Sequence, residues 1–195
     1  SALAALASVN GAIDTYSVGY RTSRLEKWDE AELAKKISTE IGSRHHEIII
    51  DLSSIEEDLF QISNILNEPY GGGLPSYYLF REASKSFKVI MTGIGGDELF
   101  GNYSNALRYQ KYFPNNKNFN MKNYIELMYN GVDKSPSLKT IKSRRMIELG
   151  WQVNDNLKDE LSKIPDIERS VERVDLALQL PNEFLHMTDI LSMQF

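Results

Sequence analysis

Strand-like and helix-like segments alternate along the first half of this 195-residue chain. Runs of β-branched and aromatic residues predict strands over 13–20, 46–52 and 88–92. Helix-forming composition and helical spacing of apolar residues predict helices before and between them, over residues 2–7, 28–42, 53–66 and 77–86. Such alternation is typical of a parallel sheet with helices on its faces. The predicted fold class is therefore α/β.

The second half of the chain has a different character. A polar break over 114–118 is followed by no convincing strand pattern. Helical stretches are expected over residues 122–130, 137–150, 156–162, 171–180 and 183–193. We therefore predict an α/β part over residues 1–112 and an all-helical part over 113–195.

Composition excludes several classes of protein. Hydrophobic residues make up 42% of the chain, enough for a core, yet no apolar run approaches the roughly 18 residues of a membrane span. The 22 basic and 27 acidic side chains give a net charge of −5, which argues against general nucleic-acid binding. The chain has no cysteine, which excludes disulfides, thiolate zinc sites and cysteine nucleophiles and fits a reducing cytoplasm. We expect a soluble cytoplasmic protein that binds neither nucleic acid nor membrane.

The strongest chemical signal is the turn that follows the predicted strand over 88–92. Gly93, Gly95 and Gly96 precede two acids, Asp97 and Glu98, at an expected helix start. Glycines let backbone N–H groups approach a ligand closely, and helix N-termini favour anions. Asp97 could then hold Mg²⁺, which prefers carboxylate and phosphate oxygens. The alternative is an ordinary strand-to-helix turn whose two acids only stabilise the helix start.

Several segments together resemble the synthetase domain of the asparagine synthetase family in order and spacing. They are residues 16–20, 41–47, 67–69, 75–79, 93–103, 180–185 and 189–193. Family members carry Ser-Gly-(Glu/Asp)-Gly-x-Asp-Glu-x-Phe-Gly-Gly-Tyr where this chain runs from Thr92 to Tyr103. The resemblance covers nearly the whole chain.

The resemblance implies a fold of the adenine nucleotide α-hydrolase (PP-loop ATPase) type, with residues 1–112 as its nucleotide-binding part. It also implies an ATP- and Mg²⁺-dependent reaction that adenylates a carboxylate, normally that of aspartate. Ammonia made from glutamine by an upstream glutaminase domain then attacks the acyl-adenylate. By position, Val18 would line the adenine pocket and Asp97 would bind Mg²⁺. The residues expected to contact ATP or substrate are Thr92, Gly93, Ile94, Gly95 and Gly96.

The chain departs from the family pattern in three places. The family's pyrophosphate loop, Ser-Gly-Gly-x-Asp-Ser, and the strand before it should precede residue 1, and a Glu-x-Arg-x-Pro-Phe segment should follow Phe195. We therefore expect an internal fragment that is inactive alone, and whose open sheet edge promotes self-association. The third departure is Ile94, which replaces an acid of the asparagine-forming members and has no polar atom.

Two alternatives to asparagine synthesis therefore stay open. One is an amidotransferase or cyclising ligase that acts on another carboxylate, which Ile94 favours. The other is a non-catalytic relative that keeps the fold as a binding module, which weak Mg-ATP binding would indicate.

Overall fold

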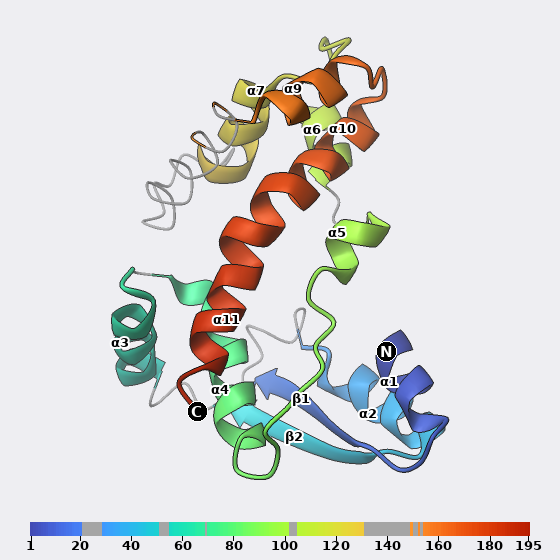
Figure 1. The fold of residues 1–195 in the computed structure, drawn as a ribbon, viewed down its shortest axis with the longest axis vertical. Coiled ribbons are helices and arrows are strands. Elements are labelled where there is room, and N and C mark those ends of the chain that lie inside the picture. The colour runs from blue at the N-terminus through green and yellow to red at the C-terminus, as the bar shows by residue number, and fades with distance from the viewer. Residues whose placement is uncertain are drawn as a thin grey trace. The chain divides into compact units, whose positions relative to one another are not determined.

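The computed structural model describes residues 1–20, 29–50, 55–68, 70–101, 105–130, 149, 152 and 154–195. They form two compact units, each described by itself (Figure 1). Unit 1 comprises Ser1–Gly93 and Thr188–Phe195, and unit 2 comprises Ile94–Met187. The functional division predicted after residue 112 stays a prediction.

Unit 1 contains the predicted alternation of helices and strands. Its elements are α1 (Ala2–Ser8), β1 (Asp14–Tyr20), α2 (Ala31–Ile41), β2 (Arg44–Ile50), α3 (Ile55–Leu66), the 3₁₀ helix η2 (Gly71–Gly73) and α4 (Leu74–Ala83). Helix α2 ends as its sequence predicts, because Gly42 takes the left-handed conformation at φ 68°. The first two predicted strands and the helices around them are confirmed within a residue or a few at each end.

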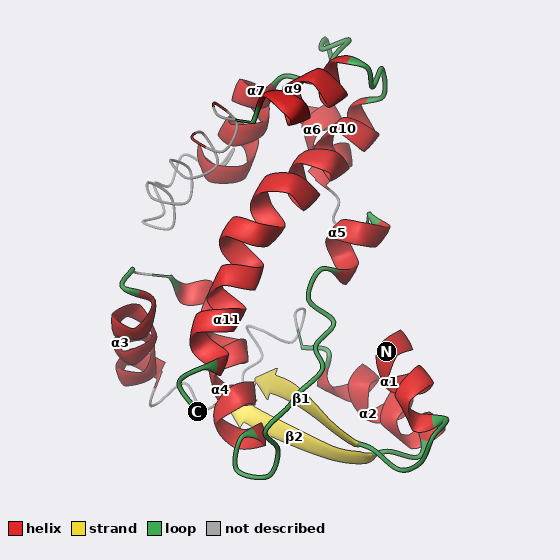
Figure 2. Ribbon diagram, in the orientation of Figure 1, coloured by secondary structure: helices red, strands yellow, loops and turns green. Residues whose placement is uncertain are grey.

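Strands β1 and β2 pair in parallel, with Val18 opposite Ile48 (Figure 2). Successive strand residues point to opposite faces of the sheet. On one face, the backbone of Gly19 lies close to Ala31 of α2. On the other, the ring of Tyr16 meets the ring of Phe87, which follows α4. A parallel sheet between helices confirms the α/β class.

The prediction of a strand over residues 88–92 is wrong. This segment has neither helical nor strand structure, and Val89 and Met91 are 83% and 72% exposed. In the described residues, β1 and β2 pair only with each other. An apolar run becomes a strand only where a neighbouring strand accepts its backbone hydrogen bonds, and here the described residues supply none.

Unit 2 is helical throughout its described residues. Its elements are α5 (Gly96–Phe100), α6 (Asn105–Tyr112), α7 (Met121–Ile125), the π-helix η3 (Glu126–Asn130), α9 (Asp155–Ser162), α10 (Ile167–Val174), the π-helix η5 (Asp175–Leu185) and the start of α11 (His186–Ser192). The described residues beyond 112 contain helices and no strand, as predicted. The helix expected over 137–150 falls outside the described residues except for Leu149.

The helices α10, η5 and α11 form one unbroken helical run, where the sequence predicts two separate helices. Pro181 lies inside η5 without ending it. A proline in a helix leaves a carbonyl without its backbone donor. Pro181 lies in a π-helical stretch, whose wider turn accommodates the proline. Beside it, the Asn182 side chain donates from Nδ2 to the Leu178 carbonyl at 2.6 Å, which is a different carbonyl from the one that Pro181 leaves without a donor.

The core of unit 2 is built from aromatic and aliphatic side chains of α6, α7, η3, α9, α10 and η5. Tyr109 and Tyr124 are fully buried, and Val171, Val174 and Leu178 form the apolar stripe of the long helical run. Each helix in the described part of the chain is too short or too polar to cross a membrane.

Candidate functional site

The glycine-rich turn keeps its predicted helix start although the strand before it is absent. Gly95 has φ 92° and precedes α5, and Gly101 has φ 64° and ends it, with its N–H donating to the Asp97 carbonyl. Only glycine adopts these left-handed angles at little cost. The two glycines therefore confine α5 to a single short turn of helix.

The structure places the predicted ligand contacts in both units. Val18 lies in β1. Thr92 and Gly93 are the last two residues of Ser1–Gly93, the first of the two segments that make up unit 1. Ile94, Gly95 and Gly96 begin unit 2. The expected role of Val18 in lining an adenine pocket stays a prediction.

The backbone at two of these glycines is open to a ligand. A Cβ atom added at Gly93 or Gly96 would meet no other atom within 4 Å. Gly95 differs, because its backbone packs against Leu180 of η5, whose methyl carbons would lie 3.5 and 3.6 Å from an added Cβ. Gly95 is therefore a packing position, whereas Gly93 and Gly96 leave room beside the chain.

The two acids of the turn point in different directions. Asp97 is exposed in the first turn of α5, whereas Glu98 is 4% exposed. Adjacent residues of a helix lie about 100° apart, so one side chain can face solvent while the next is buried. The alternative interpretation, in which both acids only stabilise the helix start, describes Asp97 better than the buried Glu98.

A buried acid that sequence reasoning missed lies in the same unit. Asp175, at the start of η5, is 3% exposed. Tyr124 donates from its hydroxyl to Oδ1 of this residue, and Asn105 donates from Nδ2 to Oδ2 at 3.1 Å. The signal was present in the sequence, because Asp175 falls four residues after Val171 and three before Leu178, on the apolar side of the helix.

Burial raises the pKa of Asp175 to about 6. The hydrogen bonds from Tyr124 and Asn105 act in the opposite direction, and the negative charges of Glu98 and Glu172 raise the pKa further. Glu98 and Asp175 are thus close enough to interact electrostatically inside unit 2.

The described residues provide few protein ligands for Mg²⁺. They contain no group of three or more histidine or acidic side chains that could hold a metal ion. Asp97 alone still suits Mg²⁺, which commonly binds through one or two carboxylates, substrate phosphates and water. An exposed carboxylate beside open backbone positions fits that type of ligation.

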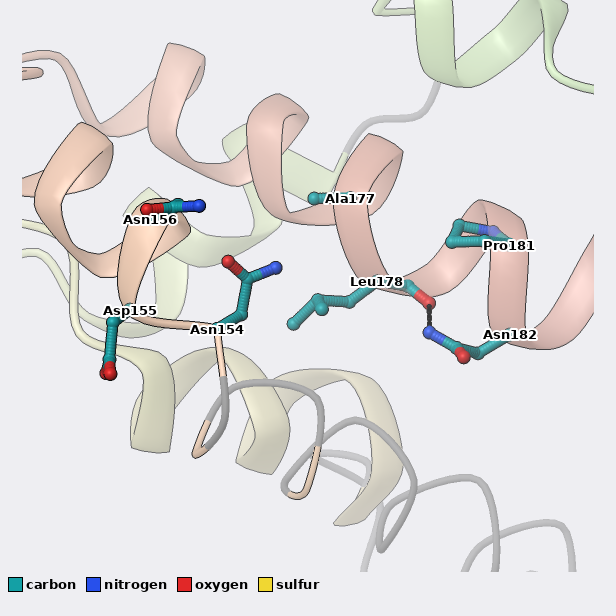
Figure 3. Close-up of a pocket in the computed structure, with 7 residues that line it drawn as sticks. All are labelled: Asn154, Asp155, Asn156, Ala177, Leu178, Pro181 and Asn182. Atoms are coloured by element: carbon teal, nitrogen blue, oxygen red, sulfur yellow. Dashed lines mark hydrogen bonds between the residues drawn. The ribbon is translucent and has the colours of Figure 1, made fainter.

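A shallow hollow of about 470 Å³ in unit 2 contains none of the predicted site residues. It is lined by Asn154–Asn156 at the start of α9 and by Ala177, Leu178, Pro181 and Asn182 of η5 (Figure 3). Two of the amides that line it serve the fold, and one of them, Asn154, accepts from the Leu157 N–H at 2.9 Å and caps α9. Asn182 bonds to the Leu178 carbonyl. We assign this hollow no role.

Comparison with known proteins gives a consistent result. The family model described as asparagine synthase matches residues 1–194. A protein of Methanocaldococcus jannaschii provisionally named asparagine synthetase (glutamine-hydrolyzing) 2 is 32% identical over 97 residues, which are 49% of this chain and 18% of that protein. A protein of Mycobacterium tuberculosis strain H37Rv, provisionally named asparagine synthetase (glutamine-hydrolyzing), is 33% identical over 107 residues, 53% of this chain and 16% of its own length.

A third relative, asparagine synthetase (glutamine-hydrolyzing) 1 of Bacillus subtilis, is 28% identical over 94 residues, 47% of this chain and 14% of that protein. The chain therefore spans less than a fifth of the length of these curated relatives. No solved structure matches the chain significantly.

Proposed function

Because the chain belongs to the asparagine synthase family, we propose that it is part of an ATP-dependent ligase that converts a carboxylate into an amide. The match of the family model to residues 1–194 carries this proposal. The proposed substrate is aspartate, the product asparagine, and the nitrogen source ammonia released from glutamine. The names of the relatives, which specify asparagine and glutamine hydrolysis, support these choices.

The proposed chemistry follows from the low reactivity of a carboxylate. One oxygen of the carboxylate attacks the α-phosphorus of ATP, and the bond from that phosphorus to pyrophosphate breaks. The product is an acyl-adenylate, whose AMP is a good leaving group. Ammonia then attacks the acyl carbon, the bond to AMP breaks, and the nitrogen loses a proton to give the amide.

The glycine-rich turn is the proposed site of nucleotide and substrate contact. Open space at Gly93 and Gly96 supports close approach of a ligand to the backbone there. Thr92, Ile94 and Gly95 complete the proposed contact segment, and Val18 of β1 lines the proposed adenine pocket. The parallel pairing of β1 and β2 supports the proposed PP-loop type of fold.

Asp97 is the proposed Mg²⁺ ligand. Its exposed carboxylate at the start of α5 suits an ion that takes most of its other ligands from phosphate and water. Bound Mg²⁺ would neutralise the charge that develops on departing pyrophosphate. The contribution of the chain is to hold the Asp97 carboxylate on a short helix fixed by two glycines.

Ile94 favours a second candidate function. An aliphatic side chain here cannot position an amine or ammonia by charge or hydrogen bonding. This supports an amidotransferase or cyclising ligase acting on a different carboxylate. The rest of the proposal, adenylation followed by attack of nitrogen, is the same for both candidates.

The deciding experiment is exchange of labelled pyrophosphate into ATP by the native protein, with and without aspartate. We expect exchange that depends on aspartate and on Mg²⁺. Asp97→Asn should lower the exchange rate about tenfold or more, as changes to metal-site carboxylates commonly do. Asp159→Asn, which removes an exposed acid of α9 paired with Lys163, is the matched control and should leave exchange unchanged.

Other outcomes distinguish the alternatives. Binding of Mg-ATP without aspartate-dependent exchange would assign the protein a different carboxylate substrate. Absence of Mg-ATP binding by the native protein would contradict the ligase proposal and favour a non-catalytic binding module. We further propose a cytoplasmic location, an upstream glutaminase domain and a homo-oligomeric assembly.

A further inference from the structure

Leu180 of η5 packs on the glycine-rich turn at the start of α5, and the two helices are in contact within unit 2 (Figure 1). A Cβ atom added at Gly95 would lie 3.5 and 3.6 Å from the two methyl carbons of Leu180, which are ordinary van der Waals distances. Among the described residues, no other atom beyond the turn itself lies within 4 Å of that point. Leu180 is therefore the side chain that supports this face of Gly95.

Gly95 sets the place where α5 begins. Its carbonyl accepts the Leu99 N–H at 3.0 Å, and its φ of 92° turns the chain into the helix. A glycine has many other backbone conformations of similar energy, so a Gly95 without support would leave the start of α5 free to vary. Asp97 lies two residues further along, and its side chain moves with that start.

The other end of α5 lies against the same helical run. The Gly101 N–H donates to the Asp97 carbonyl, and a Cβ added at Gly101 would overlap Oε1 of Glu172 in α10. Glycine at this position allows the close approach. Because α10 continues directly into η5, one helical run supports α5 at both of its ends.

The helical run that carries Leu180 is anchored in the core of unit 2. Leu178, two residues before Leu180, is 2% exposed, and it belongs to the same apolar cluster as Val171 and Val174 of α10. Close-packed interiors leave their side chains little room to shift. Leu180 therefore projects from a rigid support towards a turn whose glycines have little rigidity of their own.

We propose that Leu180 is a positioning residue for Asp97: its methyl groups hold Gly95 in place and thereby fix the helix start from which the Asp97 carboxylate extends. Binding groups keep a productive geometry when neighbouring side chains lock them by packing. The inference rests on the proposed role of Asp97 as a Mg²⁺ ligand. Leu180 itself touches neither the metal nor the substrate in this proposal.

Four variants separate this role from a general need for packing. Leu180→Ala removes both methyl carbons from Gly95, whereas Leu180→Met keeps an apolar side chain of similar volume. Leu185→Ala makes the same truncation at a 47% exposed leucine of η5 and is the matched control. Leu178→Ala removes a buried leucine from the core and shows the effect of general loss of packing.

Hydrogen exchange of the Leu99 and Gly101 amides tests the contact in the native protein without metal, because these N–H groups make the hydrogen bonds of α5. In Leu180→Ala both amides should exchange at least about tenfold faster, while amides of α9 keep their wild-type rates. Leu180→Met should stay within about threefold of wild type, and Leu185→Ala should match the wild type. Wild-type amides that exchange as fast as those of an unfolded chain would overturn the inference, because α5 would have no fixed position to lose.

A second measurement links Leu180 to the metal. The Mg²⁺ concentration for half-maximal pyrophosphate exchange should rise about tenfold in Leu180→Ala, with most of the exchange rate recovered at saturating Mg²⁺. Leu180→Met should largely restore the wild-type Mg²⁺ requirement. An unchanged Mg²⁺ requirement in Leu180→Ala, or the same two effects in Leu178→Ala, would overturn the inference. If the wild type shows no Mg-ATP binding, the proposed function fails, whereas amide exchange at Leu99 and Gly101 still reports whether Leu180 holds α5.

Discussion

At the scale of single residues, Asp175 is the group among the described residues of unit 2 whose pKa departs most clearly from that of an exposed acid. Groups from four elements face it: Glu98 of α5, Asn105 of α6, Tyr124 of α7 and Glu172 of α10. The two donors stabilise the carboxylate, but burial and the two neighbouring acids outweigh them. The pKa of Asp175 therefore rises from 3.8 to about 6.

This shift predicts a decrease in stability as pH rises from about 4 to about 6. In that range the folded protein keeps the Asp175 proton that the unfolded chain has lost, so raising the pH favours unfolding. The free energy of unfolding should fall by on the order of 3 kcal/mol from this group, since each unit of pKa is worth about 1.4 kcal/mol.

Urea denaturation at several pH values between 4 and 7 measures the effect. Asp175→Asn cannot titrate and should lose this part of the pH dependence, whereas Asp159→Asn should follow the wild type. Parallel pH dependence in the wild type and Asp175→Asn would show that Asp175 titrates normally in the folded protein.

The sequence could predict some residue roles and not others. Glycines followed by acids predicted the turn and the helix start at Asp97 correctly, because those features depend on local backbone angles. The opposite exposure of Asp97 and Glu98 could not be predicted, because a five-residue helix is too short to show an apolar period. Asp175 fell inside the helix predicted over residues 171–180 and was assigned no role, although its place on an apolar stripe indicated burial.

At the scale of elements, α10 matters because it carries Glu172 and leads directly into Asp175. Asp166 caps this helix by accepting the Glu168 N–H at 2.8 Å. Removing such a side-chain acceptor leaves a helix-terminal N–H group without its partner. The start of α10 should therefore depend measurably on this one side chain.

We predict that Asp166→Ala lowers the free energy of unfolding by about 1 kcal/mol. Asp166→Asn keeps a side-chain oxygen in the same place and should cost only a few tenths of a kcal/mol. Urea denaturation of the two variants at neutral pH gives the comparison. Equal losses for alanine and asparagine would mean that the charge of Asp166, rather than its capping bond, stabilises the helix.

The prediction of helices and strands succeeded where local sequence determines the structure, and it failed where the structure depends on pairing with a distant segment. Strands β1 and β2 were predicted from their β-branched residues, and each is the partner of the other. The run over 88–92 has the same composition but no partner strand among the described residues, which composition alone cannot reveal. Two separate helices were predicted on either side of Pro181, but the wider π-helical turn accommodates the proline within one helical run.

At the scale of the whole molecule, residues 88–93 form an exposed apolar segment that is expected to promote association between chains. Val89 and Met91 are among the most exposed apolar side chains of the described residues, and the backbone around them forms no hydrogen bond to another described residue. An exposed apolar segment with unpaired N–H and C=O groups is a template for pairing with a second chain. Large exposed apolar side chains add to this tendency.

We therefore predict that this 195-residue chain self-associates through residues 88–93, with a second copy of the same segment as the partner. Val89→Lys should shift the equilibrium towards monomer, because a lysine at a strand edge disfavours pairing by charge repulsion and desolvation. Phe60→Lys is the matched control: Phe60 is 69% exposed but lies on α3, whose backbone groups are paired within the helix. Light scattering over a range of concentrations measures the mass of each variant. A monomeric wild type, or equal loss of association in both variants, would contradict pairing through this segment and assign any association to apolar surface in general.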